Sequence, residues 1–192
     1  MLKKKNIYLV EDNCESLGSS YKNRQLGTFG NFSTFSFYYS HQLTAGEGGM
    51  IVCKNPKDYK LLQTLRSHGW DREIKKTKNT FNFINQGFNL RPLEVSAAIG
   101  INQLKRLKLM IKIRNKNREQ IIKTIINSSK WKNQYSFFKA NKYLKPSWFS
   151  LPFLINSKYL SKKRSFLKYL NKNKIETRPI ISGNFVNQPC VE

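Results

Sequence analysis

The sequence predicts an α/β fold, in which a mostly parallel sheet with its helices comes first and a smaller α+β segment follows. The stretch "NIYLVED" at residues 6–12 is a short, nearly continuous apolar run that ends in two carboxylates, which is typical of a buried parallel strand. A long helical pattern begins near Pro92, and beyond it the composition becomes aromatic and strand-like. We therefore expect a second domain to begin within that helix. Because ligands gather at the carboxyl ends of strands in open α/β sheets, Glu11 and Asp12 are candidate site residues.

Two more strands and a helix are expected after this first strand. The strand candidates are "NFSTFSFYYS" at residues 31–40 and "GGMIVCK" at residues 48–54, with a Gly-rich turn between them. Glycines in such a turn let the backbone reverse sharply or come close to a ligand. "DYKLLQTLRSHG" at residues 58–69 predicts a helix closed by Gly69, and the polar residues 71–82 predict a mobile loop.

The second half of the chain predicts one long helix, then strands, then an amphipathic helix. Pro92 suits a first helical turn. The apolar residues that follow at helical spacing are Val95, Ala98, Ile99, Leu104 and Leu107. "YSFFKANKYLKPSWFSLPFLI" at residues 135–155 is rich in strand formers. "SKKRSFLKYLNKNK" at residues 161–174 predicts the amphipathic helix, with Ser161 as its N-cap.

The composition favours a soluble, cytoplasmic protein without a metal centre. Hydrophobic residues make up 39% of the 192, which is enough for a core. There is no apolar run of about 18 residues, and the N-terminus lacks the apolar core of a signal peptide. Cys14, Cys53 and Cys190 are odd in number, far apart and form no CxxC pair. We therefore expect neither disulfides nor a zinc or iron–sulfur site.

The net charge of +24 raises the question of nucleic-acid binding. A chain this basic binds polyanions at low salt through counterion release. However, its lysines are spread over predicted loops and helix faces, and no nucleic-acid-binding motif accompanies them. Heavy use of Lys, Asn and Ile is also what an AT-rich genome produces, so nucleic-acid binding is not expected to be the main role.

Five motifs occur in an order that resembles one family. They are "VEDNCESLGSSY", "LGTFGNFSTFSFYYSH", "GEGGMIV", "LRSHG" and "GFNLRPLEVSAAIGINQL". Together they resemble the sugar aminotransferase and dehydratase family that uses pyridoxal phosphate and has the fold of type I aminotransferases. The resemblance implies that residues 1–110 form the C-terminal half of the cofactor-binding large domain. Residues 111–192 would then hold the linking helix and an incomplete small domain.

The resemblance also implies which residues hold the cofactor. Asp12 is similar to the family residue that faces the pyridine nitrogen and keeps it protonated. Glu15 is similar to a residue near the ring hydroxyl, and Ser36 to one that contacts the phosphate. Asn89 resembles a residue that reaches the phosphate of the partner subunit in a homodimer. From the residues alone, Asp12 could instead cap the next helix, Ser36 could be an ordinary strand serine and Asn89 an ordinary turn residue.

His41 occupies the position that distinguishes the branches of the family. Five residues after Ser36, family aminotransferases carry the lysine that bonds covalently to the cofactor, and this chain has His41. Imidazole cannot form that stable bond, but it can move protons. The same replacement marks the 3-dehydratases of nucleotide-linked 4-keto-6-deoxyhexoses. They use pyridoxamine phosphate to remove the C3 hydroxyl, with this histidine as base. His68 has no such counterpart and is expected to be structural.

Further expectations come from the same sub-branch, and three readings stay open. Arg178, in "RPIISGNFVNQP", is a candidate contact for the anionic nucleotide sugar. The absence of Cys between His68 and Phe88 resembles the subtype without an iron–sulfur cluster, in which glutamate regenerates the amine form of the cofactor. The alternatives to the dehydratase are a nucleotide-sugar aminotransferase and an inactive fragment or basic binding protein. The third arises because family members are roughly twice as long, so we expect exposed strand edges here.

Overall fold

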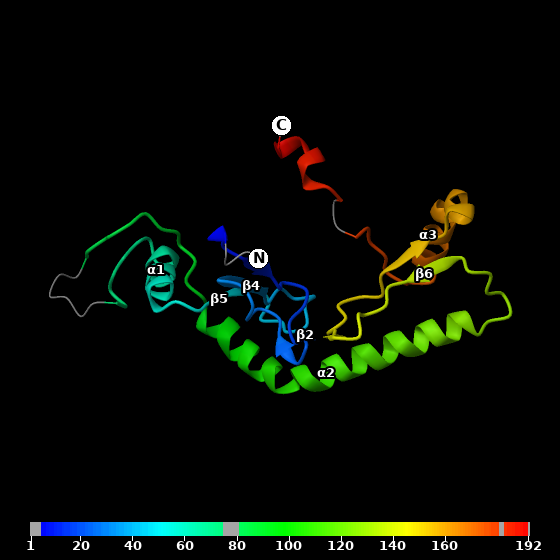
Figure 1. Cartoon of the computed structure of the whole chain (residues 1–192), viewed down its shortest axis with the longest axis horizontal. Helices are drawn as coiled ribbons and strands as arrows, with labels where there is room; N and C mark the ends of the chain where they lie inside the picture. The colour runs from blue at the N-terminus through cyan, green and yellow to red at the C-terminus, as the bar shows by residue number, and fades with distance from the viewer. Residues whose placement is uncertain (1–4, 75–80, 181–182, 192) are drawn as a thin grey trace. The chain divides into compact units, whose positions relative to one another are not determined.

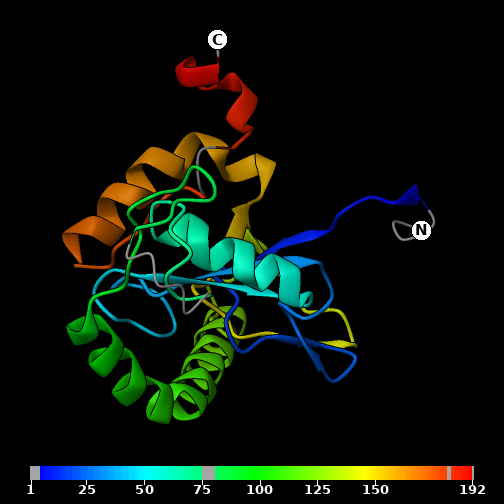
Figure 2. The ribbon, with the colours of Figure 1, turned by 90° about the vertical axis from the view of Figure 1, so that its left-hand side faces the viewer.

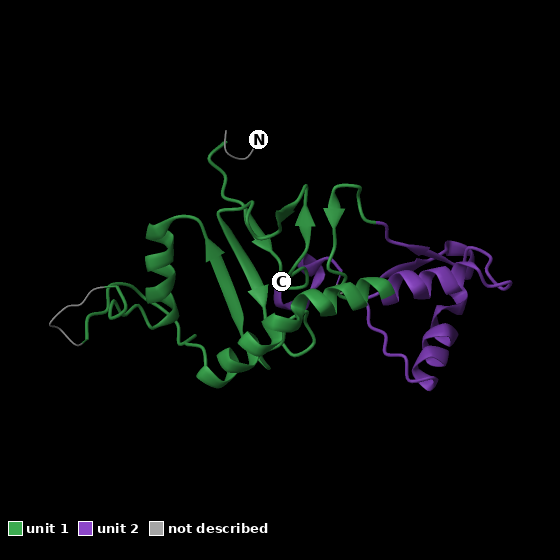
Figure 3. Ribbon diagram, turned by 90° about the horizontal axis from the view of Figure 1, so that it is seen from below, with its two compact units in different colours: residues 1–116, 140–149 green, residues 117–139, 150–192 purple. Residues whose placement is uncertain are grey.

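The computed structural model describes residues 5–74, 81–180 and 183–191, and the chain divides into two compact units (Figure 3). Unit 1 comprises residues 1–116 and 140–149, and unit 2 comprises residues 117–139 and 150–192. The long helix α2 therefore supplies residues to both units. Segment 140–149 returns to unit 1 after the chain has entered unit 2.

The main sheet of unit 1 has three strands in the order β1, β4, β5 (Figure 1). Their bounds are Val10–Asp12, Phe32–Ser36 and Gly49–Cys53. β1 runs parallel to β4, with Asp12 opposite Thr34, and β5 runs antiparallel to β4, with Gly49 opposite Ser36. The part of the sheet in this chain is thus mixed. Because β1 and β4 are parallel, their carboxyl ends lie at the same edge.

β1 corrects the expectation that "NIYLVED" is buried. The relative exposure of Ile7 is 49%, that of Tyr8 is 72% and that of Val10 is 59%. β1 is an edge strand, and among the described residues it pairs with β4 alone. The apolar pattern indicated the strand correctly, but its burial depends on neighbours that the described residues do not supply.

Unit 1 contains a second small sheet, which was not predicted from the sequence. Its order is β3, β2, β7, all antiparallel, with bounds Arg24–Gln25, Ser20–Tyr21 and Leu144–Lys145. Lys22 and Asn23 turn the chain between β2 and β3, with φ values of 49° and 60°. Two consecutive residues with positive φ are typical of a tight hairpin turn. β7 joins segment 140–149 to the N-terminal part of the chain.

Helix α1 (Pro56–Arg66) confirms the predicted helix and begins two residues earlier. Asn55 caps it, because its side chain accepts a hydrogen bond from the Lys57 N–H at 2.9 Å. The helix contacts β5 and lies alongside it (Figure 2). After its end, Gly69 adopts a φ of +85° and donates its N–H to the Thr64 carbonyl at 2.7 Å.

Two glycines fasten the segment after the loop onto the end of α1. A Cβ on Gly69 would lie 1.5 Å from the Asn85 carbonyl oxygen, and a Cβ on Gly87 would lie 2.3 Å from the Gly69 nitrogen. Backbone therefore packs directly on backbone at this point. The excursion between them is also closed at its base, since Asn82 Nδ2 donates to Asp71 Oδ2 at 2.7 Å. Of the predicted loop at 71–82, residues 75–80 lie outside the described residues.

Helix α2 (Glu94–Ile126) confirms the long helical pattern that begins near Pro92. Within unit 1 it packs on the turn before β5, where the Cβ position of Gly100 is 3.7 Å from Ala45 Cβ. Its described residues include none that is buried. Exposed apolar side chains along it include Val95, Ile99, Ile101, Leu104, Leu109 and Ile113. Neither α2 nor any other described helix combines the length and apolarity that crossing a membrane requires.

Unit 2 is built around aromatic side chains. β6 (Tyr135–Phe137) pairs antiparallel with β8 (Phe153–Ile155), and helix α3 (Lys163–Lys172) follows. The ring centroid of Tyr135 lies 5.1 Å from that of Phe153 and 5.3 Å from that of Phe166 on α3. Two further short helices, η3 and η4, span Phe185–Asn187 and Pro189–Val191.

The predicted cap of the amphipathic helix is wrong. Ser161 lies inside a 3-10 helix, η2 (Ser157–Lys162), which precedes α3. Asn156 caps η2 by accepting from the Lys158 N–H at 3.2 Å, and α3 begins without a side-chain cap. Asn156 satisfies the free N–H groups one turn earlier than Ser161 would, so the helical segment starts there.

Candidate functional site

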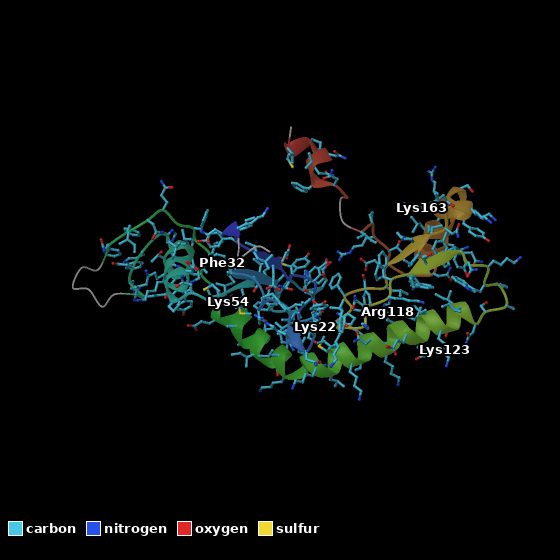
Figure 4. The ribbon with its side chains drawn as sticks, in the orientation of Figure 1. Lys22, Phe32, Lys54, Arg118, Lys123 and Lys163 are labelled. Carbon is cyan, nitrogen blue, oxygen red and sulfur yellow. The ribbon has the colours of Figure 1, made fainter. Side chains whose placement is uncertain are left out.

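Glu11 anchors the loop that leads into β4. Its carboxylate accepts hydrogen bonds from the backbone N–H groups of Gly27 at 2.7 Å, Phe29 at 2.7 Å and Gly30 at 2.5 Å. Partial burial alone would raise the pKa of Glu11, but these donors outweigh it and lower the pKa. Lys54, which is labelled in Figure 4, directly follows β5. It fixes the same loop by donating to the Phe29 carbonyl at 2.7 Å. Glu11 is thus engaged in structure.

Asp12, the next residue, presents an exposed carboxylate at the end of β1. Its Oδ1 accepts from the Cys14 N–H at 3.1 Å and from Thr34 Oγ1 at 3.4 Å. The side chain and backbone N–H of Cys14 hold the pKa of Asp12 below its usual value. Asp12 therefore carries a negative charge at the carboxyl edge of the sheet, where it is accessible to a cationic group of a ligand.

Ser36 ends β4 at the same edge. Its Oγ accepts from the Tyr38 N–H at 3.3 Å, so the hydroxyl proton remains available to donate to an anion. The chain then makes a loop that is closed at its base by two hydrogen bonds. Phe37 donates to the Gly48 carbonyl at 2.9 Å and accepts from the Ala45 N–H at 2.8 Å. The loop returns through the Gly-rich turn to β5.

His41 lies in this loop between two aromatic rings. Its ring centroid is 5.3 Å from that of Phe149 and 5.8 Å from that of Tyr38. The backbone N–H of His41 donates to the Tyr38 carbonyl at 3.0 Å. The Nδ1 atom is buried and has no hydrogen-bond partner among the described residues. A buried imidazole nitrogen without a hydrogen-bond partner is unusual in a folded chain and marks His41 as a candidate functional residue.

Gln42 was not identified from the sequence. Its side chain is 1% exposed, and its Nε2 donates to the Glu15 carbonyl at 2.6 Å and the Ser147 carbonyl at 3.2 Å. The second partner is 105 residues away along the chain. A contact over this separation cannot be predicted from a local sequence pattern.

Three further candidates belong to other segments of the chain. Glu15 is exposed on the turn after β1, and its backbone carbonyl is the part that Gln42 holds. Asn89 is exposed and forms an isolated bridge with Ser67 at the end of α1. Arg178 is exposed and belongs to unit 2. The structure thus brings Asp12, Ser36 and His41 to one edge of one sheet, while it places Asn89 and Arg178 on other elements.

The three groups at this edge fit a phosphorylated pyridine cofactor in their chemistry. A carboxylate suits a protonated ring nitrogen, a hydroxyl donor suits a phosphate oxygen, and an imidazole can accept a proton. Asp12, Ser36 and His41 are therefore the residues that could hold and use such a group.

Comparison with known proteins defines the class. The model of the DegT/DnrJ/EryC1/StrS aminotransferase family matches residues 1–192, and the chain belongs to that family. The chain is 39% identical over 199 residues to GDP-4-keto-6-deoxy-D-mannose 3-dehydratase of Escherichia coli and 34% identical over 194 residues to the Yersinia pseudotuberculosis protein of the same name. The predicted family resemblance is thus confirmed.

Solved structures confirm the predicted aminotransferase fold. The structure of E. coli GDP-4-keto-6-deoxy-D-mannose-3-dehydratase with bound hydrated PLP superposes with a TM-score of 0.88 at 35% identity, over 99% of this chain. Another structure of this dehydratase, with a trapped PLP-glutamate geminal diamine, gives a TM-score of 0.86 at 35% identity over 96% of this chain. Each match covers 50% of the solved chain.

The chain spans about half the length of the curated relatives that it matches. The alignment with the E. coli protein includes 97% of this chain and 50% of that protein. The alignment with the Yersinia protein includes 95% of this chain and 48% of that protein. The expected difference in length is therefore confirmed for these relatives.

Proposed function

We propose that this chain carries the histidine-bearing part of a pyridoxal phosphate-family 3-dehydratase. Its substrate would be a nucleotide-linked 4-keto-6-deoxyhexose, and its product a 3-deoxy sugar for deoxysugar and O-antigen-type biosynthesis. The observation that carries the proposal is His41, which stands five residues after Ser36 with a buried, unpartnered Nδ1. The similarity to two 3-dehydratases supports the substrate class.

Each residue at the sheet edge has one role in this proposal. The cofactor, in its pyridoxamine form, supplies the electron sink for removal of the C3 hydroxyl. Asp12 holds its charge because of its lowered pKa and keeps a facing ring nitrogen protonated. The Ser36 hydroxyl would donate a hydrogen bond to the phosphate, and His41 would accept a proton as the general base. The rings of Tyr38 and Phe149 contact the imidazole and restrict its orientation.

The partners are proposed on the same basis. The trapped PLP-glutamate adduct in a similar dehydratase supports glutamate as the donor that regenerates the amine form. We also propose a cytoplasmic homodimer in which Asn89 reaches the partner's cofactor phosphate. Exposed Asn89 is accessible for such a contact. Glu15 would lie near the ring hydroxyl, and Arg178 would contact an anionic group of the sugar nucleotide.

The polypeptide that carries this sequence is first purified from its own cells, and its intact mass is measured by mass spectrometry. It is then incubated with pyridoxamine 5′-phosphate, glutamate and GDP-4-keto-6-deoxymannose, and the sugar is analysed by mass spectrometry. A product lighter by one oxygen atom supports the dehydratase. Recovery of unchanged sugar under conditions in which the protein binds the cofactor would contradict it.

The same assay separates the second candidate. Family membership favours an aminotransferase as the alternative, which would place an amine at C4 and leave the C3 hydroxyl intact. A protein that ignores the cofactor but binds polyanions with a steep salt dependence would instead be a basic binding protein.

A further inference from the structure

We propose that Gln42 is a positioning residue that holds the base His41 in a fixed relation to Asp12. Its catalytic meaning rests on the proposed function, whereas its structural part stands on burial and hydrogen bonds alone. Gln42 follows His41 directly, and its side chain is 1% exposed. A buried primary amide is costly unless its donors find acceptors, so its contacts are informative.

The contacts of Gln42 match what one amide group can supply. A side-chain NH₂ has two N–H donors, and Nε2 reaches two backbone carbonyl oxygens, those of Glu15 and Ser147. Both partners are acceptors, so the nitrogen must face them, and the amide orientation is defined. The Oε1 atom is buried and has no partner among the described residues, so all of the anchoring comes from Nε2.

The two carbonyls belong to segments that carry the rest of the site. Glu15 lies on the turn after Asp12, and that turn is fixed to β4, because Asn13 donates its N–H to the Thr34 carbonyl at 2.9 Å. Ser147 lies two residues before Phe149, whose ring lies against His41. One buried amide therefore joins the Asp12 turn, the His41 loop and the Phe149 segment.

Two other hydrogen bonds of segment 147–149 lead to elements outside the His41 loop. Ser147 donates its N–H to Ser19 Oγ at 2.8 Å, and the Phe149 carbonyl accepts from Arg114 Nη1 at 3.0 Å. Those bonds tie the segment to the turn before β2 and to α2. The bond from Gln42 connects it to the loop of the base. Loss of that bond would free His41 to move relative to Phe149 and Asp12.

The experiment uses the two histidines of the chain as reporters. In the cofactor-free protein, imidazole proton and nitrogen signals are recorded for His41 and His68 by NMR. His41 lies beside the Phe149 ring, so its ring protons carry a ring-current shift. Gln42→Met keeps the side-chain length and removes both donors. We expect it to move the His41 signals toward those of an unconstrained imidazole, while the His68 signals stay in place.

Thr64→Val is the matched control. Thr64 is also fully buried in unit 1, and its Oγ1 bonds to the Leu61 carbonyl and Asn85 near His68. It should leave the His41 signals unchanged. His41 signals that stay in place in a folded Gln42→Met protein, or that move as far in Thr64→Val, would overturn the proposal.

A second variant keeps the test decisive if Gln42→Met does not fold. Gln42→Asn keeps the amide but shortens the side chain by one methylene group, so its NH₂ group should no longer reach both the Glu15 and the Ser147 carbonyls. It should move the His41 signals in the same direction, whereas unmoved signals would refute the arrangement. None of these readouts requires cofactor or turnover, so they are independent of the proposed function. In the active protein, Gln42→Met should lower kcat and leave KM nearly unchanged, and the same loss in Thr64→Val would contradict positioning.

Discussion

Each of the two units is stabilised internally by a different kind of contact. Every buried residue among those described belongs to unit 1, and most are polar: Asn13, Ser19, Ser20, Ser33, Gln42, Thr64, Ser67, Asp71 and Ser147. Unit 2 relies on half-buried aromatic rings, such as Tyr135, Phe153 and Phe166. Hydrogen bonds between buried polar groups are directional and select one arrangement, whereas ring packing tolerates several. The three edge residues of the candidate site lie on the unit that is built with directional contacts.

The largest expected effect is on activity and comes from His41, which lies in unit 1. His41→Asn keeps a polar side chain but removes the base, so the rate of C3 deoxygenation should fall by about 10²–10⁴-fold. His68→Asn is the control and should retain the rate, because His68 lies at the end of α1 away from the sheet edge. Equal losses in both variants would contradict the assignment of His41.

Core truncation should separate the two units by stability. Phe35 is 9% exposed and packs next to Gly27, where a Cβ would lie 2.3 Å from the ring. Phe35→Ala should lower the opening free energy of unit 1 by about 3–5 kcal/mol. Phe153→Ala, at a half-buried ring of unit 2, should cost about 1–2 kcal/mol. Native-state amide exchange, resolved by residue, measures each unit separately, and equal costs would mean that the contrast is not energetic.

Glu11 should make the stability of unit 1 depend on pH. Its pKa is lower in the folded state, so its stabilisation is fully present above the ordinary glutamate pKa of about 4.3 and is lost as the pH falls through the folded value. Both Glu11 oxygens accept N–H bonds, so Glu11→Gln turns one acceptor into a donor and loses at least one of these bonds along with the charge. This should cost about 1–3 kcal/mol at pH 7 and flatten the acid limb. Unfolding free energies at neutral and acid pH test this, and an unchanged acid limb would exclude Glu11 as its source.

The smallest effect is expected for the surface ion pair of unit 1. Arg66 Nη2 lies 2.6 Å from Glu73 Oε2, and the two side chains are 39% and 42% exposed. Water screens such a pair, so Glu73→Gln should change the unfolding free energy by less than about 1 kcal/mol. A salt titration of wild type and variant provides the check. A larger cost would mean that unit 1 depends on surface charge as well as on buried polar contacts.

Local patterns were sufficient for the elements that local chemistry decides. The β4 strand, α1 and α2 follow from apolar periodicity and from Asn, Pro and Gly at helix ends. Burial of β1 could not be predicted, because it depends on which strands lie beside it. The prediction of Ser161 as the cap failed for a similar reason, because Asn156 caps the helical segment instead. Both residues can accept a backbone N–H bond, and only the preceding turn decides which one does.

The site shows the same division between local and distant information. The spacing from Ser36 to His41 is visible in the sequence, and so is the carboxylate pair at the end of β1. That Glu11 anchors a loop while Asp12 stays exposed is not visible, since it depends on three N–H groups aimed at one carboxylate. The roles of Asp12, Ser36, Glu15, Asn89 and Arg178 toward cofactor and substrate remain predictions.

The glycine contact behind α1 makes the chain easy to engineer at one place. Gly69 and Gly87 press backbone against backbone, and the Asp71–Asn82 bond closes the intervening excursion at its neck. Added residues beyond that neck lengthen a loop whose ends are already joined, and the entropy of such a loop grows slowly with length. An affinity tag or a fluorescent domain spliced between residues 71 and 82 should therefore leave the sheet edge undisturbed. The protein could then be recovered or imaged without a fusion at either terminus.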